Sequence, residues 1–240
     1  MADRMASVVD PFLGAVDAVA GGRYSAVLYG SAARGDYIEG QSDINLMLIL
    51  DDVAPATLRA LGPAFGTWQK GSAEPPLVIS RGEWDRAGDA FPIEIADMRS
   101  AYRVLRGPDP LAAMEPQRAD LRRALERELR GKLLRLRQGY AVLSGDPVRL
   151  GSLASESAGT VLVLFRSLLV LSGRDVPLAP AAIVSAAAEV AGFPADAVAD
   201  VTRHRGDRKW RCEPAVFEAY LDAVATTAAH VDQLQLGDQR

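Results

Sequence analysis

Two short stretches near the start of the chain decide the fold. Residues 28–36 read LYGSAARGD, and residues 40–46 read GQSDINL. The first stretch ends an aliphatic run with a Gly-Ser turn, and the second begins another aliphatic run with an aspartate. A glycine at the end of a strand lets an anion approach the backbone, where free N–H groups can bind it. The pattern therefore predicts a phosphate-binding turn at Gly30 and Ser31, with the serine hydroxyl as an added donor.

The second stretch supplies oxygen ligands. Asp43 and Asn45 lie two residues apart on a predicted strand, 43–50, so their side chains share one face. The alternate positions form an apolar face, which consists of Ile44, Leu46, Leu48 and Leu50. Two side-chain oxygens beside a phosphate cradle are suited to a magnesium ion that bridges to a nucleotide. The two stretches together indicate a nucleotide site.

These motifs resemble the nucleotidyltransferase superfamily typified by polymerase beta, and in particular its aminoglycoside adenylyltransferase and minimal bacterial branches. The family signature is an apolar residue, Gly-Ser, a short spacer and then Asp-apolar-Asp/Glu. The resemblance implies a third carboxylate on a later strand, and Glu94 within residues 91–95, FPIEI, fits that position. In the adenylyltransferases this glutamate is the general base and a neighbour of the metal. The helical second half of the chain also resembles their architecture.

One position departs from the family pattern. Asn45 stands where the family has its second metal carboxylate, so the ligand set Asp43, Asn45 and Glu94 carries two negative charges instead of three. One Mg²⁺ that arrives with a nucleoside triphosphate could still dock, but a second metal would bind much more weakly. Nucleotidyl transfer depends on metal charge at both the attacking and the leaving oxygen. The sequence therefore supports the nucleotide site better than it supports turnover.

The resemblance implies a bacterial-type enzyme that transfers a nucleoside monophosphate, AMP from ATP, to a hydroxyl of a small molecule or a protein. Gly30 and Ser31 would cradle the phosphates, and Asp43 would hold Mg²⁺ with Asn45 as a neutral ligand. Glu94 would accept the proton of the acceptor. The alternative is a weak or inactive homologue that binds a nucleotide or a protein partner.

Two arginines are candidates for binding the triphosphate. Arg34 follows the Gly-Ser turn and could contact the phosphates or pair with Asp36. Arg166 interrupts an apolar run at residues 161–171, and a buried charge needs a partner that a phosphate could provide.

The pattern of apolar residues predicts an α+β chain with two domains. In the first, 1–110, we expect helices at 8–19 and 55–68, a helical turn at 81–86, and strands at 24–29, 43–50, 76–80, 91–97 and 102–105 of a mixed sheet. On the strand at 91–97, Asp97 has the opposite parity to Glu94 and is interpreted as a turn residue. In the second, 111–240, we expect a bundle of helices at 118–143, 150–171, 179–191, 195–204 and 214–234. The segment 107–116, rich in Gly and Pro, marks the boundary.

Composition limits the other possibilities. The chain has 240 residues, 27 basic against 31 acidic, and a formal net charge of -4. That balance argues against binding bulk nucleic acid, which usually requires a basic face. The single cysteine excludes an intrachain disulfide and fits the reducing cytoplasm. The most apolar run contains Arg166 and is too short to cross a bilayer, so we expect no membrane segment.

Overall fold

The computed structural model describes residues 2–35, 37, 43–72 and 74–235. The chain divides into two compact units, Met1–Glu115 and Pro116–Arg240. The division falls within the segment rich in Gly and Pro that the sequence marks as a boundary. Part of the opening motif, namely Asp36 and residues 40–42, lies outside the described residues.

The first unit is built on a four-stranded mixed sheet in the order β3-β2-β1-β4. β1 (Tyr24–Tyr29) pairs antiparallel with both β2 (Asn45–Leu50) and β4 (Tyr102–Arg106). β3 (Leu77–Ser80) adds to β2 in parallel. The predicted mixed sheet and the α+β class are confirmed.

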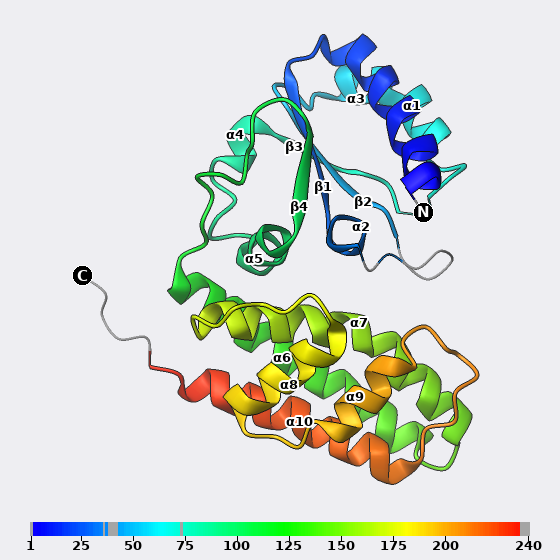
Figure 1. Ribbon diagram of the computed structural model, residues 1–240, viewed down its shortest axis with the longest axis vertical. Helices are drawn as coiled ribbons and strands as arrows, with labels where there is room; N and C mark the ends of the chain where they lie inside the picture. The colour runs from blue at the N-terminus through cyan, green and yellow to red at the C-terminus, as the bar shows by residue number, and fades with distance from the viewer. Residues whose placement is uncertain (1, 36, 38–42, 73, 236–240) are drawn as a thin grey trace. The chain divides into compact units, whose positions relative to one another are not determined.

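Helices α1 (Ala2–Ala20) and α3 (Pro55–Trp68) cover one face of this sheet, and Figure 1 shows them together on that side. The core on this face contains the apolar face predicted for β2, since its members include Ile44, Leu46, Leu48, Leu50, Phe12, Leu13 and Trp68. Alternation along β2 thus places the even-numbered side chains under α1 and α3.

The opposite face of the sheet is covered by α4 (Arg81–Trp84) and α5 (Pro92–Ser100). A second core cluster lies there, with Val27, Met47, Ile49, Trp84, Ile95 and Met98 among its members. Asn45 has the same strand parity as Met47, so its side chain lies on this face. The sheet therefore directs the polar start of β2 toward the side that α5 covers.

The strand predicted at residues 91–97 is wrong, because this segment forms helix α5. Its apolar residues alternate at Phe91, Ile93 and Ile95, which favours a strand in so short a window. Pro92 instead occupies the first turn of a helix, where its missing N–H costs nothing. The buried residues then recur with helical spacing, namely Pro92, Ile93, Ile95, Ala96 and Met98.

Five helices in the described residues of the second unit agree with the predicted bundle. They are α6 (Arg118–Leu143), α7 (Pro147–Leu171), α8 (Pro180–Ala191), α9 (Asp196–Arg203) and α10 (Pro214–Gln233). Like α10, α7 packs against all four other helices of this unit. It is the one helix of the described chain that is long and apolar enough to cross a membrane, yet 67% of its apolar window is buried inside the structure. Such burial is expected of the core helix of a bundle.

Candidate functional site

The Gly-Ser turn joins β1 to a single helical turn, α2 (Ser31–Arg34). Gly30 has φ 73° and ψ -148°, a backbone conformation that is essentially restricted to glycine. Gly35 ends α2 in the left-handed region with φ 88°, and its N–H donates to the carbonyl of Ser31. The amides of Ala33 and Arg34 donate to the carbonyl of Gly30, whereas those of Ser31 and Ala32 precede the first helical acceptor. Ser31 itself is 8% exposed.

The two halves of the sequence motif meet in the structure. Tyr29, the last residue of β1, is paired with Asn45, the first residue of β2. A Cβ added to Gly30 would lie only 2.7 Å from Nδ2 of Asn45. The turn therefore packs directly against the Asn45 side chain, which is half-buried, while Asp43 stands exposed two residues earlier. The glycine permits this close approach because it has no side chain.

Arg34 and Asp97 form an ion pair beside this turn. Nη1 of Arg34 lies 4.0 Å from Oδ1 of Asp97, and the two side chains are 7% and 15% exposed. The pair joins α2 to α5. Asp36, the other partner that the sequence suggested for Arg34, lies outside the described residues.

The pKa of the Tyr29 hydroxyl depends on burial and on the negative charges near the end of β1. Burial of its side chain is the main cause that raises the pKa of the Tyr29 hydroxyl, and negative charges raise it further. Among those charges Asp97 has the largest effect, followed by Glu94 and Glu74. Both acidic residues of α5 therefore act on the end of β1, and Asp97 acts more strongly.

Sequence reasoning missed Asp97. On a strand its parity is opposite to that of Glu94, but on a helix residues three apart lie on neighbouring parts of one face. The available signal was the helical spacing of the apolar residues in α5. Glu94 lies in the first turn of the same helix and is exposed. Whether it acts as a base stays a prediction.

The described residues contain no group of three or more His, Cys, Asp or Glu side chains placed to hold a metal ion. The predicted ligand set has only two such residues, Asp43 and Glu94, because Asn45 contributes an amide oxygen. Oxygen donors of this kind are suited to magnesium, which keeps several water and phosphate ligands instead of requiring a complete protein cage. The donor types of Asp43 and Asn45 thus fit one Mg²⁺ that arrives with a nucleotide, and the weaker binding of a second ion stays a prediction.

Arg166 belongs to the second unit. It lies on α7 and is 6% exposed, within the apolar run that it interrupts. Its burial is as expected for a charge inside a helix bundle that has found a partner. Its role toward a phosphate stays a prediction.

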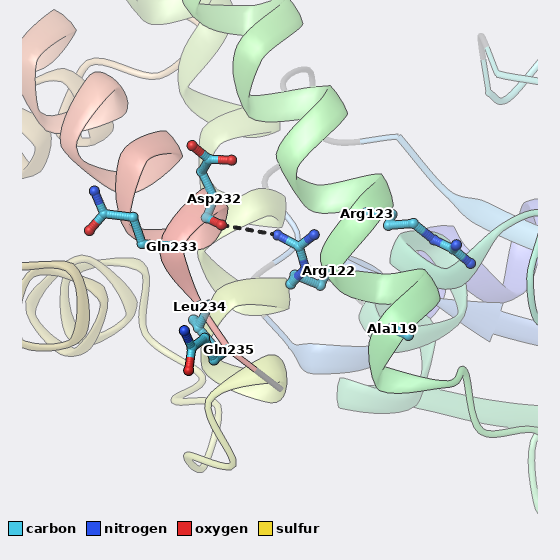
Figure 2. Close-up of a pocket in the computed structure, with 7 residues that line it drawn as sticks. All are labelled: Ala119, Arg122, Arg123, Asp232, Gln233, Leu234 and Gln235. Atoms are coloured by element: carbon cyan, nitrogen blue, oxygen red, sulfur yellow. Dashed lines mark hydrogen bonds between the residues drawn. The ribbon is translucent and has the colours of Figure 1, made fainter. Parts of the chain in front are cut away.

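A surface pocket of about 520 Å³ lies in the second unit, between the start of α6 and the end of α10. Figure 2 shows the guanidinium of Arg122 directed at the end of α10, where Nη1 donates to the carbonyls of Val231 and Asp232 at 3.1 and 3.3 Å. The same nitrogen also donates to Glu126. Arg122 thus caps the carbonyl end of a helix. This pocket contains none of the predicted site residues.

The architecture is that of the nucleotidyltransferase fold, a mixed α+β unit followed by a helical unit. The chain is similar in structure to spectinomycin adenyltransferase AAD(9) from Enterococcus faecialis, whose crystal structure contains ATP and spectinomycin. The alignment covers 95% of this chain and 99% of that one, with a TM-score of 0.58 and 12% sequence identity. At this identity the likeness shows a shared fold. No protein-family profile matches the sequence, and a search of curated proteins finds no similar sequence.

Proposed function

We propose that this chain is a nucleotidyltransferase that moves AMP from ATP to a hydroxyl group and releases pyrophosphate. The observation that carries the proposal is the close packing of Gly30 against Asn45, which brings the predicted phosphate-binding turn beside the start of the strand that follows Asp43. A turn of this form could serve many anions. The side-chain oxygens of Asp43 and Asn45 beside this turn favour a metal-bound nucleoside triphosphate in particular.

The shared fold supports ATP as the nucleotide and a small hydroxylated molecule as the acceptor. Spectinomycin adenyltransferase AAD(9) was crystallised with both kinds of ligand. A hydroxyl of a protein side chain is the other acceptor to test. The single cysteine fits the reducing cytoplasm, where we expect this protein to act.

Each site residue has a proposed task. The amides of the Gly30–Ser31 turn bind the β- and γ-phosphates, and Arg34 and Arg166 are the proposed cationic ligands of the triphosphate. Glu94 takes the proton from the acceptor hydroxyl as that oxygen attacks the α-phosphorus in line and pyrophosphate leaves. Glu94 is the better base of the two acids on α5, since it is exposed, whereas the Asp97 carboxylate is occupied by Arg34.

Asp43, Asn45 and Glu94 are the proposed ligands of magnesium. When bound, Mg²⁺ would offset phosphate charge and stabilise the leaving pyrophosphate. Among the described residues next to the start of β2, Asp43 is the one carboxylate, so its removal should abolish the metal dependence of nucleotide binding.

A second function is favoured by Asn45. With an amide in place of a carboxylate, the site could bind the nucleotide and turn over slowly or not at all. In that case the protein would act through its nucleotide-bound form, on a partner that responds to it.

The decisive experiment compares the wild type with Asp43→Ala and Asn45→Asp. For each protein we would measure Mg²⁺-dependent ATP binding by calorimetry and pyrophosphate release with a panel of hydroxylated acceptors that includes spectinomycin. Asp200→Asn, which changes a partly exposed carboxylate of the second unit, is the matched control.

The outcomes separate the two functions. Release by the wild type that Asp43→Ala abolishes supports the enzyme. Binding without release, and release only after Asn45→Asp, supports the nucleotide-binding homologue. If neither the wild type nor Asn45→Asp binds ATP, both functions are excluded.

A further inference from the structure

The strongest feature left unexplained by the proposed function is the link between α2 and α5. Arg34 is the last residue of α2, the turn that begins with Ser31. Asp97 lies one helical turn beyond Glu94 on α5. Nη1 of Arg34 approaches Oδ1 of Asp97 to 4.0 Å, and both side chains are largely withdrawn from solvent.

Partial burial makes this pair different from the ion pairs on the surface of the second unit. Exposed pairs contribute little, because water and salt screen their attraction. The Arg34 side chain is only 7% exposed, so a nearby negative charge has a strong effect on where its guanidinium lies. The two residues come from separate segments of the chain, and their contact links α2 to α5.

An arginine that is fixed before its ligand arrives binds that ligand more tightly. A free arginine side chain loses several rotatable bonds when it closes on a phosphate, and this loss weakens binding. An arginine already held in one orientation by a carboxylate avoids most of that loss. Its planar guanidinium can then serve a carboxylate and a phosphate together, because it has five N–H donors.

We infer that Asp97 is a positioning residue for the nucleotide: its carboxylate holds Arg34 beside the Gly30–Ser31 turn, in the orientation that receives the triphosphate. This inference rests on the proposed function, since it needs a phosphate ligand at that turn. It assigns Asp97 a role separate from that of Glu94. Glu94 faces solvent and serves the acceptor, whereas Asp97 is turned to the interior and serves the arginine.

The test is a double-mutant cycle on Mg·ATP binding with the full chain. The proteins are the wild type, Asp97→Asn, Arg34→Lys and the double variant, with the dissociation constant measured by calorimetry. We expect Asp97→Asn to weaken binding by about fivefold to tenfold, which is the cost of ordering one long side chain. Arg34→Lys should weaken binding at least as much, since lysine lacks the planar fork. The double variant should bind no worse than Arg34→Lys alone, because the carboxylate acts only through the arginine.

Two further variants separate positioning from a merely structural role. Asp97→Glu keeps the charge and should recover part of the affinity that Asp97→Asn loses. Asp200→Asn removes one partner of the exposed Arg203–Asp200 pair and should leave binding unchanged. Thermal unfolding of each variant shows whether it is folded at the temperature of the binding experiment.

The results distinguish this inference from the proposed function. If the wild type does not bind Mg·ATP, the proposed function fails and the inference fails with it. If the wild type binds but Asp97→Asn changes the affinity by less than twofold, the inference alone is overturned. Additive losses in the double variant, or a lower unfolding temperature with unchanged affinity, would also overturn it.

Discussion

Replacement of Gly30 by alanine tests the geometry at the centre of the candidate site. Two costs can be estimated separately. Gly30 has φ 73° and ψ -148°, and an alanine held in such a conformation costs about 1–3 kcal/mol. The new Cβ would also lie 2.7 Å from Nδ2 of Asn45, so this side chain must leave its rotamer at a cost of about 0.5–1.5 kcal/mol. We therefore expect Gly30→Ala to destabilise the first unit by about 2–4 kcal/mol.

Urea unfolding followed by tryptophan fluorescence measures this change, since Trp68 and Trp84 both lie in the first unit. Gly35→Ala is the matched control. Gly35 also has a positive φ, 88°, but a Cβ there would meet nothing within 4 Å. Gly35→Ala should lower the free energy of unfolding only by the cost of a left-handed backbone, about 1–2 kcal/mol.

A second background isolates the contact with Asn45. In the Asn45→Ala protein the obstructing amide is gone, so Gly30→Ala should cost less by about 0.5–1.5 kcal/mol. If Gly30→Ala costs no more than Gly35→Ala, and the cost is the same in both backgrounds, then the turn does not pack against Asn45. The geometric basis of the site would then be wrong.

Three substitutions, tested by unfolding, and one thiol-labelling experiment probe the second unit. Gly151→Ala on α7 would bring a Cβ to 1.9 Å from the carbonyl oxygen of Trp210, which is backbone, so we expect a loss of about 2 kcal/mol or more. Gly131→Ala on α6 meets nothing within 4 Å and should instead stabilise by about 0.5–1 kcal/mol; equal effects of the two would refute this. Asp146→Ala removes the side chain that accepts from the amides of residues 148 and 149 at the start of α7, and denaturant titration should show a loss of about 1 kcal/mol. Burial raises the pKa of the Cys212 thiol to about 11 from 9.0. A thiol reagent at pH 8 should therefore react slowly with the native protein and rapidly in denaturant. Stability should fall between about pH 9 and pH 11, where the unfolded thiol has lost its proton and the native one has kept it; fast native labelling would contradict the burial.

An element of this fold is predictable from the sequence when its pattern of apolar residues is contained within the element itself. The alternation in β2 is local, and it correctly places Ile44, Leu46, Leu48 and Leu50 in one core. The same holds for α6, whose apolar stripe predicts both of its ends. The segment that became α5 contains two patterns at once. Its first residues alternate like a strand, and only the continuation through Ala96 and Met98 distinguishes a helix.

The site was predictable only in part, for the same reason. The motif placed Gly30 and Asn45 together because their spacing along the chain is short and a strand pair joins them. The contact between Arg34 and Asp97 depends on the packing of α5 against the sheet, which no local pattern encodes. If residues 91–97 formed a strand, the side chain of Asp97 would lie on the face opposite to that of Glu94. The helix instead brings both acids to the end of β1.

The formal charges of the proposed site residues and of Asp97 affect what can bind at this site. Asp43, Glu94 and Asp97 contribute three negative charges and Arg34 contributes one positive charge, so these four side chains sum to -2. A bare triphosphate would be repelled by that sum, and the turn amides would have to offset the repulsion. A divalent cation would neutralise this net charge of -2. We therefore expect ATP affinity to rise with added Mg²⁺ and to fall at least tenfold with excess EDTA. Asn45→Asp should steepen the dependence on magnesium, because it makes the sum -3. If ATP instead binds equally well in EDTA, the turn and its arginine act without a metal, and Asp43 has no ligand role at the site.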